Sequence, residues 1–442
     1  MTNALKVGIA GLGTVGSALF TAIESRTDML SDICGRPIEI TAVCARDRSR
    51  DRGIDLSKAV WFDDPVALAG TGDIDVLVEL IGGDGDPAYS SVKAALARGV
   101  HVVTANKALL ARHGVELAEM AEEAGVLLNF EAAVAGGIPV IKAMRESLTG
   151  NSVSRVYGIL NGTCNYILTR MQKENMGFAE CLSEAQRLGY AEADPTFDIG
   201  GFDTAHKLAI LTSLAFGTQI ACDEVYIEGI TNISIEDIHA AEDLGYRIKL
   251  LGVAQRTVSG IEQRVHPTMV PFDSMIAQVD GVTNAVTIQA DILGELMLSG
   301  PGAGGDATAS AVLGDIADIA KAQPGHQHGP ALGRPAKHLN PYVQAEMRSH
   351  EGGYFISMKV DDKIGVFASV AGQMAKSHIS LESIVQRTMA KHKDADNLKT
   401  IILVTHATTE ASVREAVEGI RSEGYLRGEP QVIRIERTNG NA

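Results

Sequence analysis

The chain contains no run of 18 apolar residues, so we expect no helix that spans a membrane. Its first residues, MTNALKVGIAG, lack the basic start and the long apolar stretch of a secretion signal. Positive charge is scarce: Lys and Arg total 39 against 55 Asp and Glu, and the formal net charge is −16. Such an acidic protein is a poor partner for nucleic acid or for an anionic membrane, so we expect neither.

Cysteine is sparse as well, and the five cysteines form no CxxC pair. An odd set of cysteines does not suit a disulfide framework and fits a reducing compartment better. We therefore expect a cytoplasmic protein. Its 442 residues exceed one ordinary domain, and the length indicates about two to four domains, each with its own core.

Strand-like and helical segments alternate over roughly the first 140 residues, a pattern typical of a parallel, doubly wound sheet. The predicted strands are residues 5–10, 39–46, 73–82, 99–105 and 125–130, and the predicted helices include residues 89–98 and 108–124. We therefore expect a Rossmann-type α/β nucleotide-binding domain over residues 1–140.

A glycine-rich turn, Gly11-Leu-Gly13-Thr-Val-Gly16, follows the first predicted strand and opens a helix. The first glycine allows the tight turn, the second lets the backbone approach a pyrophosphate, and the third lets helix and strand pack closely. The positive end of the helix then faces the phosphates. This context predicts dinucleotide binding, with a structural glycine turn as the alternative. The candidate contacts are Gly11, Gly13, Thr14, Val15 and Gly16.

The end of the second predicted strand carries Arg46 and Asp47. An arginine at this place can pair with the 2′-phosphate of NADP, whereas an acid would hold the free ribose of NAD. Arg46 therefore favours NADP. NAD stays possible through Asp47, and a solvated strand end is the remaining interpretation of Arg46.

Two more segments point toward the same ligand crevice. Thr104 to Lys107 directly follow a predicted strand, and the carboxyl ends of parallel strands face the crevice. Lys107 could meet a substrate carboxylate or the reacting oxygen, or it could be an ordinary surface lysine. Residues 300–306, GPGAGGD, form a second glycine-rich turn before a helix, and residues 300–322 are expected to complete the first domain.

The alternation stops near residue 140, and we expect an α+β second domain over residues 141–299. Ser234 and Asp237 resemble a capping box at the start of a helix. Further helices are predicted from Pro139 to near Gly150, over residues 178–188 and over residues 203–216, and strands over residues 152–161, 250–255 and 286–290.

Four carboxylates precede a single lysine in GYAEADPTFDIGGFDTAHKLAI, residues 189–210. Asp203 and Lys207 are four residues apart on one helix face, where a surface ion pair is the plainer interpretation. That interpretation leaves the acid-rich segment before the helix unexplained. A buried Lys207 would suit proton transfer to or from an alcohol oxygen during hydride transfer, and the other acids could hold a substrate ammonium group. The four carboxylates are Glu192, Asp194, Asp198 and Asp203.

Cys164 lies in the segment Asn161-Gly-Thr-Cys-Asn165. A nucleophilic cysteine would indicate a phosphorylating aldehyde dehydrogenase, but no histidine lies nearby in the sequence to activate it. We favour the alternative, a packed and unreactive cysteine.

Proline, glycine and histidine are frequent in residues 323–352, which we expect to form a flexible linker. Its His326 and His328 could ligate a metal, but a solvated linker is the simpler interpretation. Residues 353–436 follow the order β-α-β-β-α-β of a ferredoxin-like module, which we expect to have an independent core.

Several segments together resemble the homoserine dehydrogenase family along nearly the whole chain. They are GLGTVGSAL, VVTANKALLARHG, FEAAVAGGIPVI, ILNGTCNYIL, LGYAEADPTFDIGGFDTAHKLAIL and GPGAGGDATASAV. The resemblance implies reversible NAD(P)-dependent oxidation of L-homoserine to L-aspartate 4-semialdehyde, a step toward threonine and methionine. It also implies that the second domain binds substrate and dimerises, so a homodimer or homotetramer is expected.

The resemblance assigns roles to individual residues. Lys207 matches the lysine of proton transfer and Asp203 its partner, and Lys107 matches a lysine at the nicotinamide and the substrate. Substrate contacts fall on Glu192, Asp198, Gly162 and Thr163, which leaves Cys164 without a nucleophilic role. Further cofactor contacts fall on Thr104, Lys107 and Gly304. A monovalent cation, Na⁺ or K⁺, is expected at Glu131, Val134, Gly136 and Ile138, where oxygen ligands suit a hard cation.

The C-terminal module, residues 353–436, resembles an ACT domain and so implies feedback by threonine. Ile364 stands where that motif usually has proline before Gly365. An oligomerising module without a ligand is the alternative. Two other functions stay open: a different ACT-linked Rossmann dehydrogenase, and an amino-acid sensor that lost turnover. Residues 192–207 oppose the first, and the presence of every polar catalytic position opposes the second.

Overall fold

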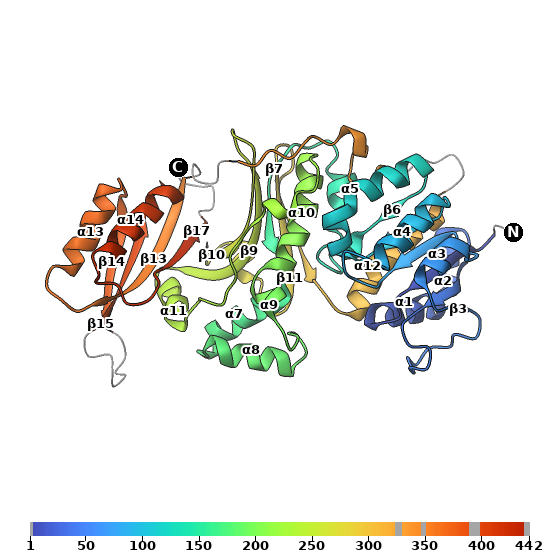
Figure 1. Ribbon diagram of the computed structural model, residues 1–442, viewed down its shortest axis with the longest axis horizontal. Helices are drawn as coiled ribbons and strands as arrows, with labels where there is room; N and C mark the ends of the chain where they lie inside the picture. The colour runs from blue at the N-terminus through green and yellow to red at the C-terminus, as the bar shows by residue number, and fades with distance from the viewer. Residues whose placement is uncertain (1–2, 323–328, 346–350, 389–397, 437–442) are drawn as a thin grey trace.

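The computed structural model describes residues 3–322, 329–345, 351–388 and 398–436. Figure 1 shows three parts in a row: a parallel sheet with its helices, a central sheet, and a C-terminal α/β module. Among the described residues, every helix is too short or too polar to cross a bilayer.

The first part is a six-stranded parallel sheet in the order β3-β2-β1-β4-β5-β6. The strand order reverses between β1 and β4, which is where such sheets bind ligands. The short edge strand β3 was not predicted, since three residues carry too little periodicity. The strands are β1 Leu5–Ala10, β2 Ile38–Cys44, β3 Val60–Phe62, β4 Val76–Glu79, β5 His101–Thr104 and β6 Leu128–Asn129.

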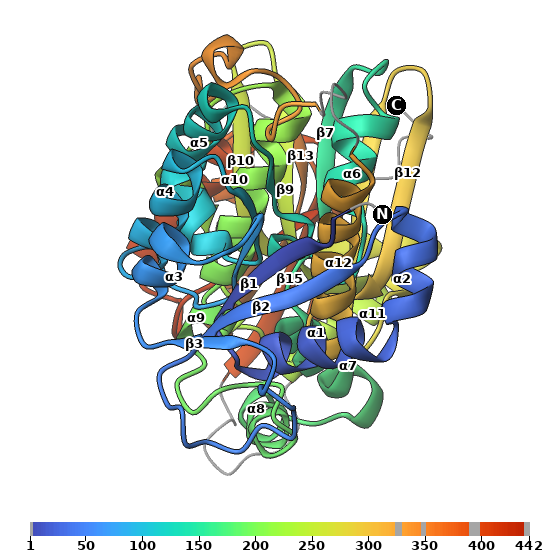
Figure 2. The same ribbon diagram turned by 90° about the vertical axis from the view of Figure 1, so that its right-hand side faces the viewer.

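Helices cover both faces of this sheet, because successive strand residues alternate between two apolar clusters. One face packs α1 Thr14–Ser25, α2 Thr27–Cys34 and α12 Gly305–Lys321. The other packs α3 Pro65–Thr71, α4 Ala88–Ala97 and α5 Lys107–Ala124. Figure 2 shows α12 beside α1, although nearly 300 residues of chain separate the two helices.

The second sheet has 11 strands and runs through the rest of the molecule. Its first strands are β7 Val153–Ile159, β8 Tyr226–Ile227, β9 Tyr246–Arg256, β10 Ile261–Pro271, β11 Thr283–Ala290 and β12 Gly294–Pro301. The associated helices are α6 Val140–Lys142 with a π-helical turn over Ala143–Ser147, α7 Gly162–Glu174, α8 Phe178–Arg187, α9 Thr196–Ile199, α10 Phe202–Phe216 and α11 Ile235–Asp243. The capping box of Ser234 and Asp237 at the start of α11 is confirmed.

The C-terminal module has the predicted β-α-β-β-α-β order, and its four strands lie in the order β17-β13-β15-β14. Its elements are β13 Glu351–Asp361, α13 Val366–Lys376, β14 Leu381–Thr388, β15 Leu398–Thr405, α14 Glu410–Ser422 and β17 Gln431–Ile435; β16, Thr408–Thr409, pairs with β13. In contrast to the expected independent core, β17 also pairs in parallel with β10, through Thr268 with Arg434 and Met269 with Ile435. The module therefore extends the central sheet.

The expectation of a flexible linker is wrong for residues 329–345. Leu332 and Leu339 are buried, and Asn340 bridges to Thr218 while Gln344 bridges to Ile261. The backbone N–H of Ala336 donates to the Glu122 carboxylate of α5 at 3.0 Å. Apolar residues spaced among the prolines and glycines dock this segment, which the composition alone did not reveal. The other expected linker residues, including His326 and His328, lie outside the described residues, apart from 351–352 at its end.

Candidate active site

Asp203 carries two lysine partners at the junction of the first and second parts. The Lys207 ammonium donates to Asp203 Oδ2 at 2.7 Å and to the carbonyl oxygen of Leu160 at 2.7 Å. The Lys107 ammonium lies 3.1 Å from Asp203 Oδ1. Lys207 is only 9% exposed, so the pair with Asp203 is not the surface ion pair that its helical spacing also allowed.

Helix starts position these side chains. Gly201, with φ of 89°, adopts a left-handed conformation at the N-cap of α10 and places Asp203 in the first helical turn. Lys107 is the first residue of α5, whose N-cap residue is Asn106. Burial alone would raise the pKa of Asp203, but Lys207 and Lys107 outweigh it and hold this pKa well below its usual range. Asp203 is therefore ionised and fixed.

Asn161 joins the two carboxylates, and sequence reasoning did not assign it a role. Its side-chain amide donates to Asp198 Oδ1 and to Asp203 Oδ2, both at 2.9 Å. Its Oδ1 accepts from the backbone N–H of Cys164 and so caps α7. The signal available in the sequence was an asparagine before a helix whose start we did not predict.

Asp198 and Thr163, two residues expected to contact the substrate, lie next to this centre. Thr163 Oγ1 donates to the carbonyl oxygen of Tyr190 at 2.6 Å and lies 3.4 Å from Asp198 Oδ2. Burial raises the pKa of Asp198, and the negative charge of Asp203 raises it further. Gly162 has no room for a side chain, because a Cβ would lie 2.7 Å from the carbonyl oxygen of Val282.

Cys164 is packed, as we favoured. It is fully buried, and its Sγ lies 3.2 Å from the carbonyl oxygen of Asp198. Burial raises the pKa of this thiol well above its usual value, so the thiolate needed for nucleophilic attack is disfavoured.

The remaining two acids of the cluster lie apart from Asp203. Asp194 accepts from the backbone N–H and the hydroxyl of Thr196, so it stabilises a local turn. Glu192 is exposed, and its carboxylate has no hydrogen bond or ion pair with any other residue that the structure describes.

A buried network stiffens the crevice beside Lys107. Glu79, at the end of β4, accepts from Thr104 Oγ1 at 2.6 Å and from the backbone N–H of Ile81 at 2.7 Å. Thr104 in turn accepts from the backbone N–H of Asn106 at 3.0 Å. Thr104 is thus completely buried and shapes the crevice from behind. Glu79 was missed, although a glutamate that ends an apolar strand is the available signal.

The glycine-rich turn has the expected geometry. Gly11 has φ of 111°, and a Cβ there would lie 2.5 Å from the carbonyl oxygen of Leu80. A Cβ on Gly16 would collide with the Gly11 carbonyl, whereas nothing lies within 4 Å of the corresponding position on Gly13. The turn is therefore closed on the protein side and open at Gly13. Thr14 and Val15 begin α1, and Gly304 is the N-cap of α12.

A cavity of about 400 Å³ adjoins this turn and includes Arg46 and Asp47 in its lining. Arg46 is exposed, while Asp47 accepts from the backbone N–H and the hydroxyl of Ser49. Those Ser49 hydrogen bonds lower the pKa of Asp47. The Asp47 carboxylate therefore stabilises a local turn. The exposed Arg46 side chain is available to contact a bound cofactor. Arg50 and Arg52 also line this cavity, and we had not singled them out.

The expected cation ligands lie on one buried turn. Glu131 is 3% exposed, and its two oxygens accept from the backbone N–H groups of Ile141 and Lys142, each at 2.8 Å. Burial raises the pKa of Glu131 to about 7, although these two hydrogen bonds oppose the rise. Gly136 has φ of 55° between Val134 and Ile138. The described residues contain no group of three or more His, Cys, Asp or Glu side chains arranged to hold a metal.

Known proteins match nearly the whole length of the chain. The model "Homoserine dehydrogenase, NAD binding domain" matches residues 11–131, and the model "Homoserine dehydrogenase" matches residues 139–317. The homoserine dehydrogenase of Pseudomonas aeruginosa is 43% identical over 439 residues, 98% of this chain and 99% of that protein. The chain belongs to the homoserine dehydrogenase family.

Solved structures agree with this assignment. A homoserine dehydrogenase from Thiobacillus denitrificans has a TM-score of 0.91 at 40% identity, covering 98% of both chains. A hyperthermophilic archaeal homoserine dehydrogenase in complex with NADPH has a TM-score of 0.61 at 28% identity, covering 71% of this chain and 96% of that chain. The chain is thus an NAD(P)-dependent oxidoreductase that acts on the CH–OH group of homoserine.

Proposed function

We propose that Lys207 moves the proton in the conversion of L-homoserine to L-aspartate 4-semialdehyde. An ammonium group has three hydrogens, and Lys207 donates two of them to Asp203 and to Leu160. The third position is available to the substrate hydroxyl. In the reduction, the ammonium would donate its third hydrogen to the carbonyl oxygen as hydride reaches the same carbon. In the oxidation, the neutral amine form of Lys207 would accept the hydroxyl proton as hydride leaves that carbon and so become the ammonium. Asp203 holds the ammonium in place.

Lys107 and the neighbouring polar groups hold the substrate in this proposal. Lys107 is one-third exposed beside Asp203, so it can contact both the substrate and the nicotinamide. Asp198, Gly162 and Thr163 form the inner wall, and Glu192 approaches the ammonium end of homoserine from its exposed segment. This last role requires Glu192 to move toward the cluster or to meet the substrate at its rim.

The cofactor in this proposal is NADP, with NAD as the weaker alternative, and it supplies or accepts the hydride. Gly11, Gly13, Thr14, Val15 and Gly16 would hold the pyrophosphate, with Lys107 and Gly304 at the nicotinamide side. Thr104 is fully buried, so it would support this wall from behind rather than contact the cofactor. The preference rests on Arg46, which is exposed at the cavity, and on Asp47, which is engaged with Ser49.

A monovalent cation, Na⁺ or K⁺, is proposed at Glu131 and the carbonyl groups of Val134, Gly136 and Ile138. The donor set fits in its chemistry, because all four ligands are oxygens and the carboxylate is buried. A cation would keep Glu131 ionised there. Its proposed role is to hold this turn, and no catalytic step depends on it.

The C-terminal module is proposed to be an ACT domain that responds to threonine, in an enzyme that works as a homodimer or homotetramer. Its β-α-β-β-α-β topology supports this assignment. The proposed division is residues 1–140 with 300–322 for nucleotide binding, 141–299 for substrate binding and dimerisation, and 353–436 for regulation.

The pair of lysines on Asp203 is the observation that carries the catalytic proposal. The test is a spectrophotometric scan of NADP- and NAD-linked oxidation over homoserine and related amino and hydroxy acids. We expect homoserine to be preferred by kcat/KM. Preference for another hydroxy acid, or no turnover of any, would contradict the substrate roles assigned to Lys107, Asp198 and Glu192.

A further inference from the structure

Glu79 is a completely buried acid at the carboxyl end of β4, beside the crevice but outside the set of residues proposed to act on the substrate. In the parallel sheet it lies opposite Thr104, the last residue of β5. Lys107 follows Thr104 by three residues and begins α5. The contacts that fix Glu79 and Thr104 therefore also affect where Lys107 starts.

Both oxygens of Glu79 face hydrogen-bond donors. Oε1 accepts from the backbone N–H groups of Ile81 at 2.7 Å and Gly82 at 3.2 Å. Oε2 accepts from the Thr104 hydroxyl at 2.6 Å. An ionised carboxylate only accepts, so it matches the donors at both ends of this side chain. No cationic side chain of the described residues pairs with Glu79, so these hydrogen bonds offset the cost of its burial.

Asn106 closes these contacts into a ring. Its backbone N–H donates to Thr104 Oγ1 at 3.0 Å, and its side-chain amide donates to the carbonyl oxygen of Gly83 at 2.7 Å. Its Oδ1 accepts from the backbone N–H of Leu109 at 3.1 Å and so caps α5. With Glu79 hydrogen-bonded to Thr104, the contacts join the ends of β4 and β5 to the start of α5.

The ring lies between the cofactor cavity and the Asp203 cluster. Leu80 and Ile81 line the cavity beside the glycine-rich turn. The Leu80 carbonyl oxygen would lie 2.5 Å from a Cβ on Gly11, so the loop after β4 packs directly on that turn. On the other side, the Lys107 ammonium lies 3.1 Å from Asp203 Oδ1. One set of hydrogen bonds thus connects the wall of the cofactor cavity to this lysine.

We propose that Glu79 is a positioning residue that holds the Lys107 ammonium at the substrate. It acts through Thr104, whose single hydroxyl hydrogen goes to Glu79 and whose Oγ1 accepts from the backbone of Asn106. Lysine has a flexible four-carbon stem, so the direction in which α5 starts decides whether the ammonium reaches Asp203. The inference rests on the proposed role of Lys107 in holding homoserine, and it adds the group that sets the start of α5.

Glu79→Gln tests the ring at constant shape. The glutamine oxygen can still accept from Ile81 and Gly82, but its NH₂ group then faces Thr104, whose hydroxyl hydrogen loses its acceptor. We expect kcat/KM for homoserine to fall about tenfold or more, mainly through KM, while the dissociation constant of NADPH changes less than about threefold. Thr104→Val removes the hydroxyl from the same ring and should lower kcat/KM similarly. Steady-state oxidation with NADP and fluorescence titration with NADPH measure the two quantities.

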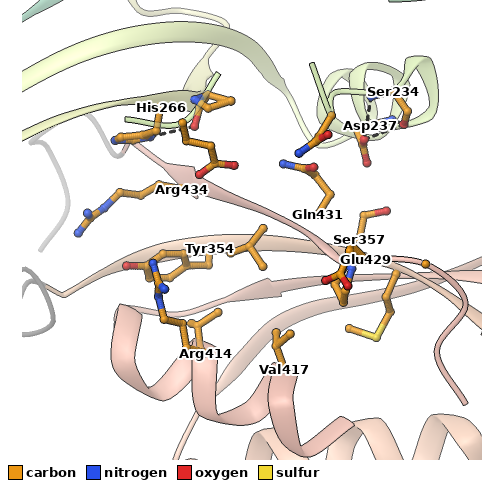
Figure 3. A pocket seen from close by; sticks show the side chains of 18 of the residues that line it. Ser234, Asp237, His266, Tyr354, Ser357, Arg414, Val417, Glu429, Gln431 and Arg434 are labelled. Atoms are coloured by element: carbon orange, nitrogen blue, oxygen red, sulfur yellow. Dashed lines mark hydrogen bonds between the residues drawn. The ribbon is translucent and has the colours of Figure 1, made fainter. Parts of the chain in front are cut away.

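Asp237→Asn is the matched control. Asp237 is another buried carboxylate that accepts from a hydroxyl and a backbone N–H, both of Ser234 (Figure 3). It lines a cavity of about 920 Å³ where the C-terminal module meets the central sheet. That lining, all within the described part of the chain, includes no residue of the ring or of the Asp203 cluster. We expect this variant to keep the parent kinetics.

A double-mutant cycle with Lys107→Ala separates positioning from general support of the fold. If Glu79 acts through Lys107, adding Glu79→Gln to Lys107→Ala should lower kcat/KM by less than about twofold. A loss of folded enzyme would instead lower kcat/KM by the same factor in both backgrounds.

The inference fails if Glu79→Gln keeps the parent kcat/KM, if its loss is as large in the Lys107→Ala background, or if NADPH binding weakens as much as kcat/KM falls. A parent-like Lys107→Ala enzyme would contradict the proposed function as well, because Lys107 would then not hold the substrate. A strong loss in Lys107→Ala together with no loss in Glu79→Gln would leave that function intact and remove Glu79 from it.

Discussion

The side-chain amide of Asn161 lies 2.9 Å from Asp203 Oδ2, the same oxygen that accepts the Lys207 ammonium at 2.7 Å. Asn161→Ser should keep the cap of α7, because serine is also a good N-cap residue, but lose both amide donors. Hydrogen bonds to charged groups contribute about 1.5–3 kcal/mol, so we expect kcat/KM to fall about tenfold or more. Steady-state kinetics measure this.

Thr409→Ser, a change at the N-cap of α14, is the matched control and should leave the kinetics unaltered. A thermal melt of Asn161→Ser should shift only slightly. If its activity equals that of the parent, Asn161 only caps the helix.

Lys207→Ala should reduce kcat strongly while NADPH still binds. Loss of a general acid–base group costs roughly 10²–10⁴-fold, and Lys207 lies beside Asp203 at the substrate side of the crevice. Stopped-flow rates and fluorescence titration of NADPH separate the two effects. Lys93→Ala is the matched control, because Lys93 pairs with Glu116 and not with Asp203. This variant should behave like the parent enzyme. A Lys207→Ala rate within about threefold of the parent, far below that range, would remove Lys207 from the proton-transfer role.

Arg46→Ala should weaken NADP binding much more than NAD binding. A charge-assisted contact to the 2′-phosphate contributes about 1.5–3 kcal/mol, and NAD lacks this phosphate. Dissociation constants for both cofactors give the result, with Lys58→Ala as a control for loss of one exposed positive charge. Equal losses for NADP and NAD would show that Arg46 does not read the phosphate.

Local patterns predicted the elements that carry the two lysines proposed to act in catalysis. Periodicity and turn residues placed the helices of Lys107 and Lys207, and the glycine-rich turn placed the dinucleotide site. Long-range contacts were not accessible in the same way. Asn161 contacts carboxylates 37 and 42 residues away, and Glu79 contacts Thr104 on the next strand. No local pattern specifies such partners.

Strand β10 was not predicted from the sequence, and its charged residues explain why. Glu262, Arg264 and His266 give this strand the composition of an exposed segment, yet all are at most 4% exposed. Their burial depends on β17, which comes more than 160 residues later. Periodicity assumes that charged residues face water, so a strand whose charges pair across a distant contact is not recognised.

Adding K⁺ or Na⁺ should raise the melting temperature more at pH 8 than at pH 5. Because the folded pKa of Glu131 is raised to about 7 from 4.5, the native state binds more protons between these values, and stability falls as pH rises through that window. Above pH 7, ionisation of the buried Glu131 lowers the free energy of unfolding by on the order of 3 kcal/mol, an upper value that follows from the size of the pKa shift. A bound cation would offset it. Calorimetry in KCl, NaCl and choline chloride of equal ionic strength provides the test.

Glu131→Gln removes the titrating charge, so it should abolish the difference between potassium and choline at pH 8. If all three salts act alike on the parent enzyme, the four oxygens at Glu131, Val134, Gly136 and Ile138 do not form a cation site.

Truncation before Tyr354 should yield an unstable enzyme, although the composition of residues 323–352 first suggested separable cores. Removing the module leaves the edge of β10 unpaired at Thr268 and Met269. It also removes Arg434 from Glu262, with Nη1 and Oε1 3.5 Å apart, and Glu410 from Arg264. Breaking a buried ion pair by deleting one partner costs about 3–5 kcal/mol, a large share of the stability of a typical domain.

A chain that ends at Glu436 is the matched control, because it keeps β17 and the ion pair between Glu436 and Arg155 at 2.6 Å. We expect it to melt and turn over like the full chain, whereas the chain that ends at Gly353 should melt at a lower temperature or aggregate. Scanning calorimetry and homoserine oxidation rates compare the three. A short chain with the parent melting temperature and rate would mean that the pairing of β10 with β17 contributes little. Threonine titration of that short chain would then show whether the proposed response to threonine requires the module.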